Sequence, residues 1–279
     1  LEKSLPDDTR SALSAYSDGV NSFITLNRKK LQIEFDILQY EPELWEPAHS
    51  LLLLRLFAWQ MSFGRSCDLT NSEIISKVGT LRAAELLQTT VKSSDYPNLN
   101  NSPYLDQIIK LNSFLESRFG ISSSSLGNVW VIGSKKSASG HPIIANDQHS
   151  FYTNPSPWYS VSLHSPLYDV TGLSLPGIPG VLIGSNGKTS WGFTNGMADD
   201  CDFYLETLDS MGFSKYFYDN SWNNLSVINE KIYVKNSLPI DFTVYQTNRG
   251  ALISTFQEAK NSFDYRKENH RNREITIPK

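Results

Sequence analysis

Apolar residues recur every three or four positions through the first part of the chain, the period that places them on one face of a helix. This pattern predicts a first helix over residues 7–24 and a second over 47–61. Thr70 and Glu73 form a capping-box pair, which predicts that another helix begins at Thr70. Two further amphipathic stretches are predicted to be helical, 81–91 and 104–119.

The pattern changes after the serine run Ser122–Ser125, which has no apolar anchor and predicts an exposed linker. Beyond it, the apolar runs are short and bounded by Gly, Pro, Asn and Ser, as is typical of strands. Strands are predicted at 128–133, 142–145, 158–163, 181–184, 189–194, 231–235 and 240–246. Helices first and strands afterwards favour an α+β arrangement.

Composition narrows the class of protein. The 279 residues, 39% hydrophobic and 19% charged, suffice for one large globular domain or two small ones. A net charge of −4 without a Lys/Arg-rich run argues against a nucleic-acid partner, and no apolar run is long enough to span a membrane. Two cysteines exclude a four-cysteine zinc site. Because the chain begins at Leu1 without a signal-like segment, we expect a processed chain or a fragment.

Common catalytic motifs are missing from the sequence. It contains no GxSxG, HExxH, P-loop or GxGxxG pattern, and its 5 histidines lack the spacing of metal ligands. These motifs therefore assign no chemistry to the chain.

A series of short blocks is more informative than any single motif. In chain order they are Ala15–Asn21, Pro42–Pro47, Gly127–Ser134, Ser139–His149, Trp158–Tyr159, Tyr168–Gly172, Pro176–Gly180, Ile183–Gly187, Trp191–Asn195 and Asp199–Asp202. In this order and spacing the blocks resemble the penicillin acylase (penicillin amidase) family of N-terminal-nucleophile hydrolases.

The resemblance implies a fold and a division of the chain. The fold is the α+β, N-terminal-nucleophile hydrolase αββα sandwich, in which two stacked antiparallel sheets lie between layers of helices. The chain divides into a helical α-chain-like part, 1–121, a spacer, 122–126, and the start of a β-chain-like catalytic part, 127–279. Family precursors cut themselves into these two chains, and the new N-terminal serine of the β chain is the nucleophile.

The resemblance also implies an activity and partners. The activity is hydrolysis of the amide of an N-acylated small molecule, such as a β-lactam side chain, an acyl-homoserine lactone or a lipopeptide. The implied partners are this small molecule and the missing N- and C-terminal parts of the same precursor, with neither nucleic acid nor membrane. The implied location is periplasmic or secreted.

The nucleophile position departs from the family pattern. Counting back from Asn128 and Trp130 places it at Gly127, where the family has serine. Because glycine has no hydroxyl, we expect an uncleaved and inactive chain. A deliberate Ser-to-Gly change that traps the precursor and a natural homologue without the nucleophile both stay open.

Further residues match site positions of the family. His149 falls where a His or Gln holds the nucleophile in place, and Asn195 falls where a backbone N–H donates to the oxyanion. A polar loop residue and a turn residue are the plain alternatives at these two positions. Ser150 and Ile183 fall at acyl-pocket positions that are often aromatic in penicillin G acylases, which argues against a phenylacetyl substrate. A second oxyanion donor, an asparagine in the family, is expected beyond Lys279.

An acidic segment matches the calcium-binding segment of the family. The resemblance implies Ca²⁺ held by the side chains of Asp199 and Asp202, the carbonyl of Cys201 and an acid from the helical part, for which Asp68 is the candidate. A solvated acidic turn is the alternative. Since Cys67 precedes Asp68, shared ligation would bring the two cysteines close enough for a disulfide, with two separate thiols as the alternative.

Different classes of function stay open from the sequence. The first is the acylase-type amidohydrolase, the second is a catalytically dead homologue that serves as a binding or scaffold protein, and the third is a structural fragment without a pocket. A serine restored at position 127 separates the first two, because self-cleavage supports only the first.

Overall fold

The computed structural model describes residues 2–28, 30–87, 109–110, 113–114, 117, 127–150, 152–196, 200–209, 214–253 and 273–278. The chain folds as two compact units, each built from two separate stretches. Unit 1 combines residues 1–61 with 116–196, and unit 2 combines 62–115 with 197–279.

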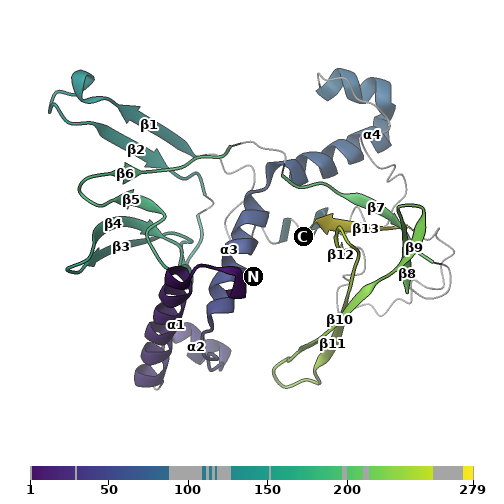
Figure 1. Cartoon of the computed structure of the whole chain (residues 1–279), viewed down its shortest axis with the longest axis horizontal. Helices are drawn as coiled ribbons and strands as arrows, with labels where there is room; N and C mark the ends of the chain where they lie inside the picture. Colours follow the sequence, from purple (N-terminus) through teal and green to yellow (C-terminus); the bar gives the residue numbers. More distant parts are fainter. Residues whose placement is uncertain are drawn as a thin grey trace. The chain divides into compact units, whose positions relative to one another are not determined.

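Helices occupy the first part of the chain (Figure 1). The α-helices in the described ranges are α1 (Asp7–Asn27), α2 (Ile33–Leu38), α3 (Pro47–Met61) and α4 (Phe63–Leu87), and the 3-10 helix η1 (Glu2–Ser4) precedes them. The predicted helices over 7–24 and 47–61 are confirmed by α1 and α3. The sequence does not predict α2, which is only 6 residues long.

The predicted helix start at Thr70 is wrong. Thr70 lies inside α4, which begins at Phe63. The break in this helix falls instead at Gly79, whose φ of 77° lies outside the helical region. Glu73 does not act as a capping partner but forms an ion pair with Lys77, four residues on along the helix.

Several predicted segments lie partly or wholly outside the described residues. The predicted helix over 81–91 is confirmed as far as Leu87. Within 104–119, the described residues 109–110, 113–114 and 117 are helical, and the rest of this prediction lies outside the described residues. The predicted spacer, 122–126, lies outside them as well, so the division at 121 and 127 stays a prediction.

Antiparallel strands occupy the second part of the chain. They are β1 (Asn128–Ile132), β2 (Ile143–Asp147), β3 (Tyr159–His164), β4 (Asp169–Ser174), β5 (Ile183–Ser185), β6 (Ser190–Trp191), β7 (Tyr204–Thr207), β8 (Lys215–Tyr218), β9 (Ser221–Asn224), β10 (Ser226–Ile232), β11 (Ile240–Gln246), β12 (Gly250–Leu252) and β13 (Arg273–Pro278), with the 3-10 helix η2 (Ser134–Lys136) after β1. The predicted strand over 231–235 is misplaced, because β10 already ends at Ile232.

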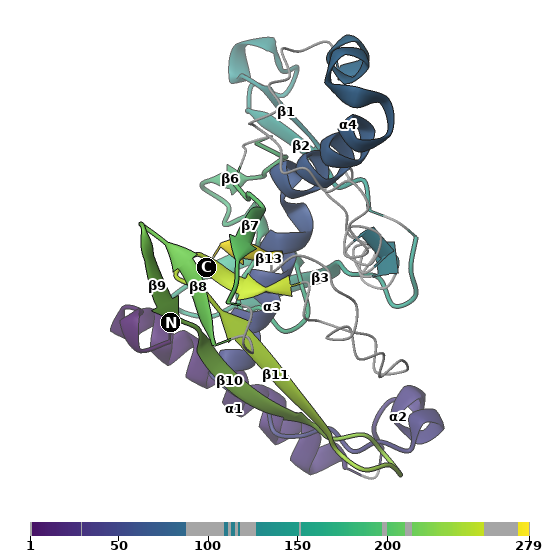
Figure 2. The same cartoon turned by 90° about the vertical axis from the view of Figure 1, so that its right-hand side faces the viewer.

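The strands pair within each unit. In unit 1 they form the β1–β2 hairpin and a sheet of order β3-β4-β5-β6, and in unit 2 a sheet of order β10-β11-β12-β13-β7 and the β8–β9 hairpin. Figure 2 shows β10 and β11 as a long two-stranded ribbon. A helical first part followed by antiparallel sheets confirms the α+β prediction. The stacking of two sheets between helices stays a prediction.

Contacts among the quoted blocks hold unit 1 together. α1 packs along α3 (Figure 1). Asn21 on α1 brackets the backbone of Trp45, donating from Nδ2 to the carbonyl oxygen over 2.9 Å and accepting the Trp45 N–H at Oδ1 over 2.6 Å. The Tyr16 hydroxyl accepts the N–H of Gly177 over 2.8 Å. Gly177 has a φ of 95°, so a side chain there would be strained.

Unit 2 has its own apolar core. The buried residues Leu208, Tyr216, Leu225 and Leu252 form one apolar cluster. This cluster stabilises the sheet that includes β7 and β12 through apolar burial.

Candidate active site

The predicted nucleophile position lies at a strand end in unit 1. Gly127 directly precedes β1 and is buried, and its neighbour Asn128 pairs with Asp147 at the end of β2. The Thr194 hydroxyl donates a hydrogen bond to the Gly127 carbonyl oxygen. Because Asn195 is the next residue after Thr194, the structure brings the nucleophile position together with the segment that carries the predicted oxyanion donor.

Two carboxamides bind the same segment to the strand end. Asn146 Nδ2 donates to the carbonyl oxygens of Asn128 over 2.8 Å and Phe193 over 3.2 Å. Asn146 Oδ1 accepts the Phe193 N–H over 3.1 Å, and Gln148 Nε2 donates to the Phe193 carbonyl oxygen over 2.9 Å. We call residues 127–128 the strand end and residues 193–195 the oxyanion segment. Side chains of β2 and the loop after it therefore tie these two backbone stretches together.

His149 lies beside the strand end, on its exposed side. Its Nε2 lies 2.5 Å from Asp147 Oδ2 and 3.2 Å from Asn128 Nδ2. A carboxylate only accepts, so Nε2 carries a proton when it donates to Asp147. This hydrogen bond is the largest cause of the lowered pKa of Asp147, with a smaller contribution from Asn128. His149 thus contacts the residue that follows the nucleophile position.

The strand end leaves little space at residue 127. A Cβ built on Gly127 would lie 2.7 Å from the Asp147 carbonyl oxygen, closer than real contacts allow, and 3.1 Å from the Gln148 carboxamide. A serine at this position therefore requires the backbone around Asp147 to shift. The Gln148 carboxamide is the nearest side-chain group to that Cβ.

The two predicted acyl-pocket residues lie in different surroundings. Ser150 Oγ accepts the Nε1–H of Trp158 over 3.3 Å. The Trp158 ring meets Phe57 edge-on at 6.3 Å and Phe193 at 6.4 Å between ring centroids, so Ser150 borders an aromatic cluster that sequence reasoning missed. Ile183 is buried in β5, opposite a residue of β4.

The predicted calcium ligands are only partly described. Asp199 lies outside the described residues. Among the residues that the structure describes, no three His, Cys, Asp or Glu side chains gather as a metal site. Asp68, Cys201 and Asp202 thus do not make a cation site by themselves, and the calcium set stays a prediction that depends on Asp199. Close by in sequence, Asp200 accepts a hydrogen bond from the Ser62 hydroxyl over 2.6 Å.

The sequence leaves a disulfide between the two cysteines open against two separate thiols, and the structure shows no disulfide. No disulfide joins Cys67, which is half-buried in α4, to Cys201, which is buried before β7. The prediction required both cysteines to flank one calcium ion. Asp199 lies outside the described residues, so the shared calcium ion that would bring the two cysteines together stays a prediction.

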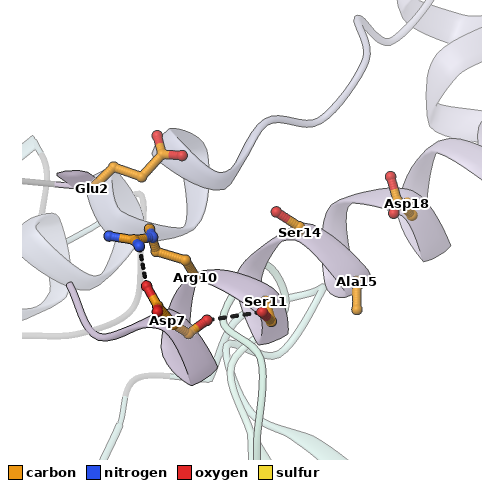
Figure 3. A pocket seen from close by; sticks show the side chains of 7 residues that line it. All are labelled: Glu2, Asp7, Arg10, Ser11, Ser14, Ala15 and Asp18. Carbon is orange, nitrogen blue, oxygen red and sulfur yellow. Dashed lines mark hydrogen bonds and ion pairs between the residues drawn. The ribbon is translucent and has the colours of Figure 1, made fainter.

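A surface hollow lies along the start of α1 in unit 1 (Figure 3). Its lining is polar and includes Glu2, Asp7, Arg10 and Asp18. Arg10 is already engaged there by Asp7 and by the Leu5 carbonyl oxygen, the latter over 2.9 Å. The hollow therefore offers no group from the strand end or the oxyanion segment.

Sequence reasoning found Gly127 and His149 but gave no role to Asn146, Gln148 or Thr194. A signal for Asn146 exists, because asparagine is depleted in strands and this one falls at the end of an apolar run.

Of the helices within the described ranges, none combines the length and hydropathy that crossing a membrane requires.

Comparison with known proteins gives consistent relatives. A family described as penicillin amidase matches residues 1–276. An acyl-homoserine lactone acylase of Pseudomonas aeruginosa is 31% identical over 268 residues, covering 88% of this chain and 30% of the relative. A penicillin G acylase of Escherichia coli is 34% identical over 136 residues, covering 49% of this chain and 16% of the relative.

Among solved structures, a thermostable penicillin G acylase from Alcaligenes faecalis is 26% identical with a TM-score of 0.37, over 46% of this chain and 21% of that one. The chain spans about 30% of the length of the Pseudomonas relative. The family match covers nearly the whole chain. Three of the blocks, Gly127–Ser134, Ser139–His149 and Trp191–Asn195, meet at one strand end in unit 1. The chain belongs to the penicillin amidase family.

Proposed function

We propose that the protein carrying this chain is an acylase-type amidohydrolase that cleaves the amide of an N-acylated small molecule. Membership of the penicillin amidase family and relatives named as acylases support this activity. The single observation that carries it is the hydrogen bond from Thr194 to the Gly127 carbonyl oxygen. It joins the position of the nucleophile to the residue that precedes the proposed oxyanion donor, Asn195.

The chemistry follows from these positions. A serine Oγ at residue 127 would attack the amide carbon, and its proton would pass through a base to the leaving amine. Water would then hydrolyse the acyl ester and release the carboxylic acid. The Asn195 backbone N–H would stabilise the negative oxygen of each tetrahedral intermediate, and His149 would steady the strand end through Asp147, which pairs with Asn128. Gly127 has no hydroxyl, so we propose that this chain is uncleaved and inactive.

An acyl-homoserine lactone is the first substrate to test. The relative named as an acyl-homoserine lactone acylase aligns with 88% of this chain, whereas the penicillin G acylase of Escherichia coli aligns with 49%. Ser150 and Ile183 replace residues that are often aromatic where a phenylacetyl group binds, which favours an aliphatic acyl chain.

The test compares Gly127→Ser with the unchanged full-length protein. Gly133→Ser on the same hairpin is the matched control, because a Cβ at Gly133 meets nothing within 4 Å. Mass spectrometry reports cleavage between residues 126 and 127, and chromatography reports homoserine lactone released from an N-acyl-homoserine lactone. We expect only Gly127→Ser to be cut and to release the lactone. Release by the unchanged protein would contradict its proposed inactivity.

A second candidate is a non-catalytic binding protein that kept the fold. The close approach of the Asp147 carbonyl oxygen to residue 127 favours it, because the strand end fits a glycine. In that case Gly127→Ser stays a single inactive chain, while calorimetry detects the acylated ligand bound without turnover.

Calcium and location belong to the same proposal. Ca²⁺ would be held by Asp199 together with Asp68, Asp202 and the Cys201 carbonyl, a set of oxygen ligands that suits this ion. Its role would be structural, and calorimetric titration with calcium chloride tests it. The family resemblance supports a periplasmic or secreted protein.

A further inference from the structure

We infer that Asn146 is a positioning residue, which sets the strand end (residues 127–128) against the oxyanion segment (residues 193–195). The inference deepens the proposed function and rests on it for the catalytic meaning of this placement. Asn146 itself touches neither the nucleophile position nor a substrate, so its effect passes through the backbone that it binds.

The geometry requires a carboxamide. Asn146 offers its Nδ2 hydrogens to the Asn128 and Phe193 carbonyl oxygens, and its Oδ1 receives the Phe193 N–H. The Phe193 backbone presents one donor and one acceptor, and the amide of Asn146 matches both at once while it also donates to Asn128. Ionised aspartate lacks the donors, and alanine lacks both the donors and the acceptor.

Gly192 leaves the room that the Asn146 side chain needs. A Cβ on Gly192 would lie 2.6 Å from Asn146 Oδ1 and 3.0 Å from its Cγ, so the absence of a side chain at 192 lets the carboxamide reach the backbone of the oxyanion segment. Gln148 adds a further donor to the Phe193 carbonyl oxygen. Thr194 supplies the second connection, from the oxyanion segment back to Gly127.

The chain contains its own control for this kind of contact. Asn21, in the same unit, also donates to the carbonyl oxygen and accepts from the N–H of one backbone residue. That residue is Trp45, just before α3, and not a residue of the oxyanion segment. Removing either carboxamide should loosen unit 1 to a similar degree. Only the loss of Asn146 should move residue 127 relative to Asn195.

Two measurements test the inference. The first is residue-resolved amide hydrogen exchange of this chain. Asn146→Ala should speed exchange of the Phe193 amide by about tenfold, since one net hydrogen bond is lost, whereas Asn146→Asp keeps the acceptor and leaves this amide protected. Asn21→Ala should speed exchange of the Trp45 amide and leave Phe193 unchanged.

The second measurement is the rate of self-cleavage in full-length protein that carries Gly127→Ser. Adding Asn146→Ala or Asn146→Asp should slow cleavage about tenfold, because both lose the donor to the Asn128 carbonyl oxygen, and Asn21→Ala should not. The Asp variant should recover relative to its parent as pH falls below about 4, where the protonated acid donates again. A merely structural role predicts no such recovery.

The outcomes separate this inference from the proposed function. Unchanged exchange of the Phe193 amide in Asn146→Ala overturns the inference, as does cleavage that is equally fast with and without Asn146. If Gly127→Ser alone is never cleaved, the proposed function fails, and the exchange of the Phe193 amide still decides whether Asn146 holds the oxyanion segment.

Discussion

Removal of one buried carboxylate in unit 2 should destabilise that unit strongly. Glu206 is 1% exposed, and its Oε2 accepts a hydrogen bond from Arg249 over 2.9 Å. The Arg249 guanidinium also lies over the rings of Tyr204 and Tyr218, at 4.6 and 4.9 Å. Thr247 Oγ1 donates to the other oxygen of Glu206 over 3.1 Å. Glu206→Ala therefore leaves a cation and a buried hydroxyl without their acceptor.

The magnitude follows from this loss. Breaking a buried ion pair by removing one partner costs about 3–5 kcal/mol. The Arg249 side chain is 30% exposed and regains some hydration, so we expect the lower end, about 3 kcal/mol. Since about 1.4 kcal/mol is a factor of ten, exchange of amides that open with unit 2 should speed by about 100-fold.

Amide hydrogen exchange by mass spectrometry can locate this effect. The increase should appear in β7, β11 and β12 and leave β3 and β4 of unit 1 unchanged. Glu230→Ala is the matched control, because Glu230 is an exposed glutamate on β10 of the same sheet and its loss should stay within about 0.5 kcal/mol. Exchange in unit 2 that rises less than about threefold in Glu206→Ala would refute the reasoning.

Further predictions concern unit 1. Gly127→Ala should destabilise the chain by about 1–3 kcal/mol in urea unfolding, because its Cβ would lie 2.7 Å from a backbone carbonyl oxygen. The hydrogen bond from His149 lowers the pKa of Asp147, so the stabilisation from this pair is present above the usual aspartate pKa and is lost as pH falls through the lowered pKa. In NMR titration, His149→Ala should raise the pKa of Asp147. Tyr16→Phe should cost about 1–2 kcal/mol in thermal unfolding, since the buried Gly177 N–H loses its acceptor.

The elements that sequence predicts well are those that bury part of their length, such as α1 at Leu13 and β11 from Phe242 to Gln246. α1 and β11 follow helical and strand patterns closely, and their bounds are nearly those expected. β10 is exposed at every position, so no alternation marks it, and its predicted position is shifted. The sequence does not predict β4, because Gly172 lies at its centre, where a Cβ would meet the Ile183 carbonyl oxygen at 2.0 Å. A strand interior that needs glycine for close backbone approach lacks the residues by which strands are recognised.

Some residues of the candidate site can be placed from the sequence and others cannot. The order of the blocks places Gly127 and His149, because each lies next to a recognisable strand: Gly127 precedes β1 and His149 follows β2. Asn146 is different, since its partner Phe193 lies 47 residues away and the contact exists only after β1, β2 and the oxyanion segment are placed. Asparagine is depleted in strands, so by residue propensity alone Asn146 argues against a strand at its position. A half-buried carboxamide must nevertheless satisfy both of its polar ends, and the nearest group able to do so is a peptide of another segment. An asparagine that interrupts an apolar strand thus indicates that a distant backbone stretch docks there, without indicating which one.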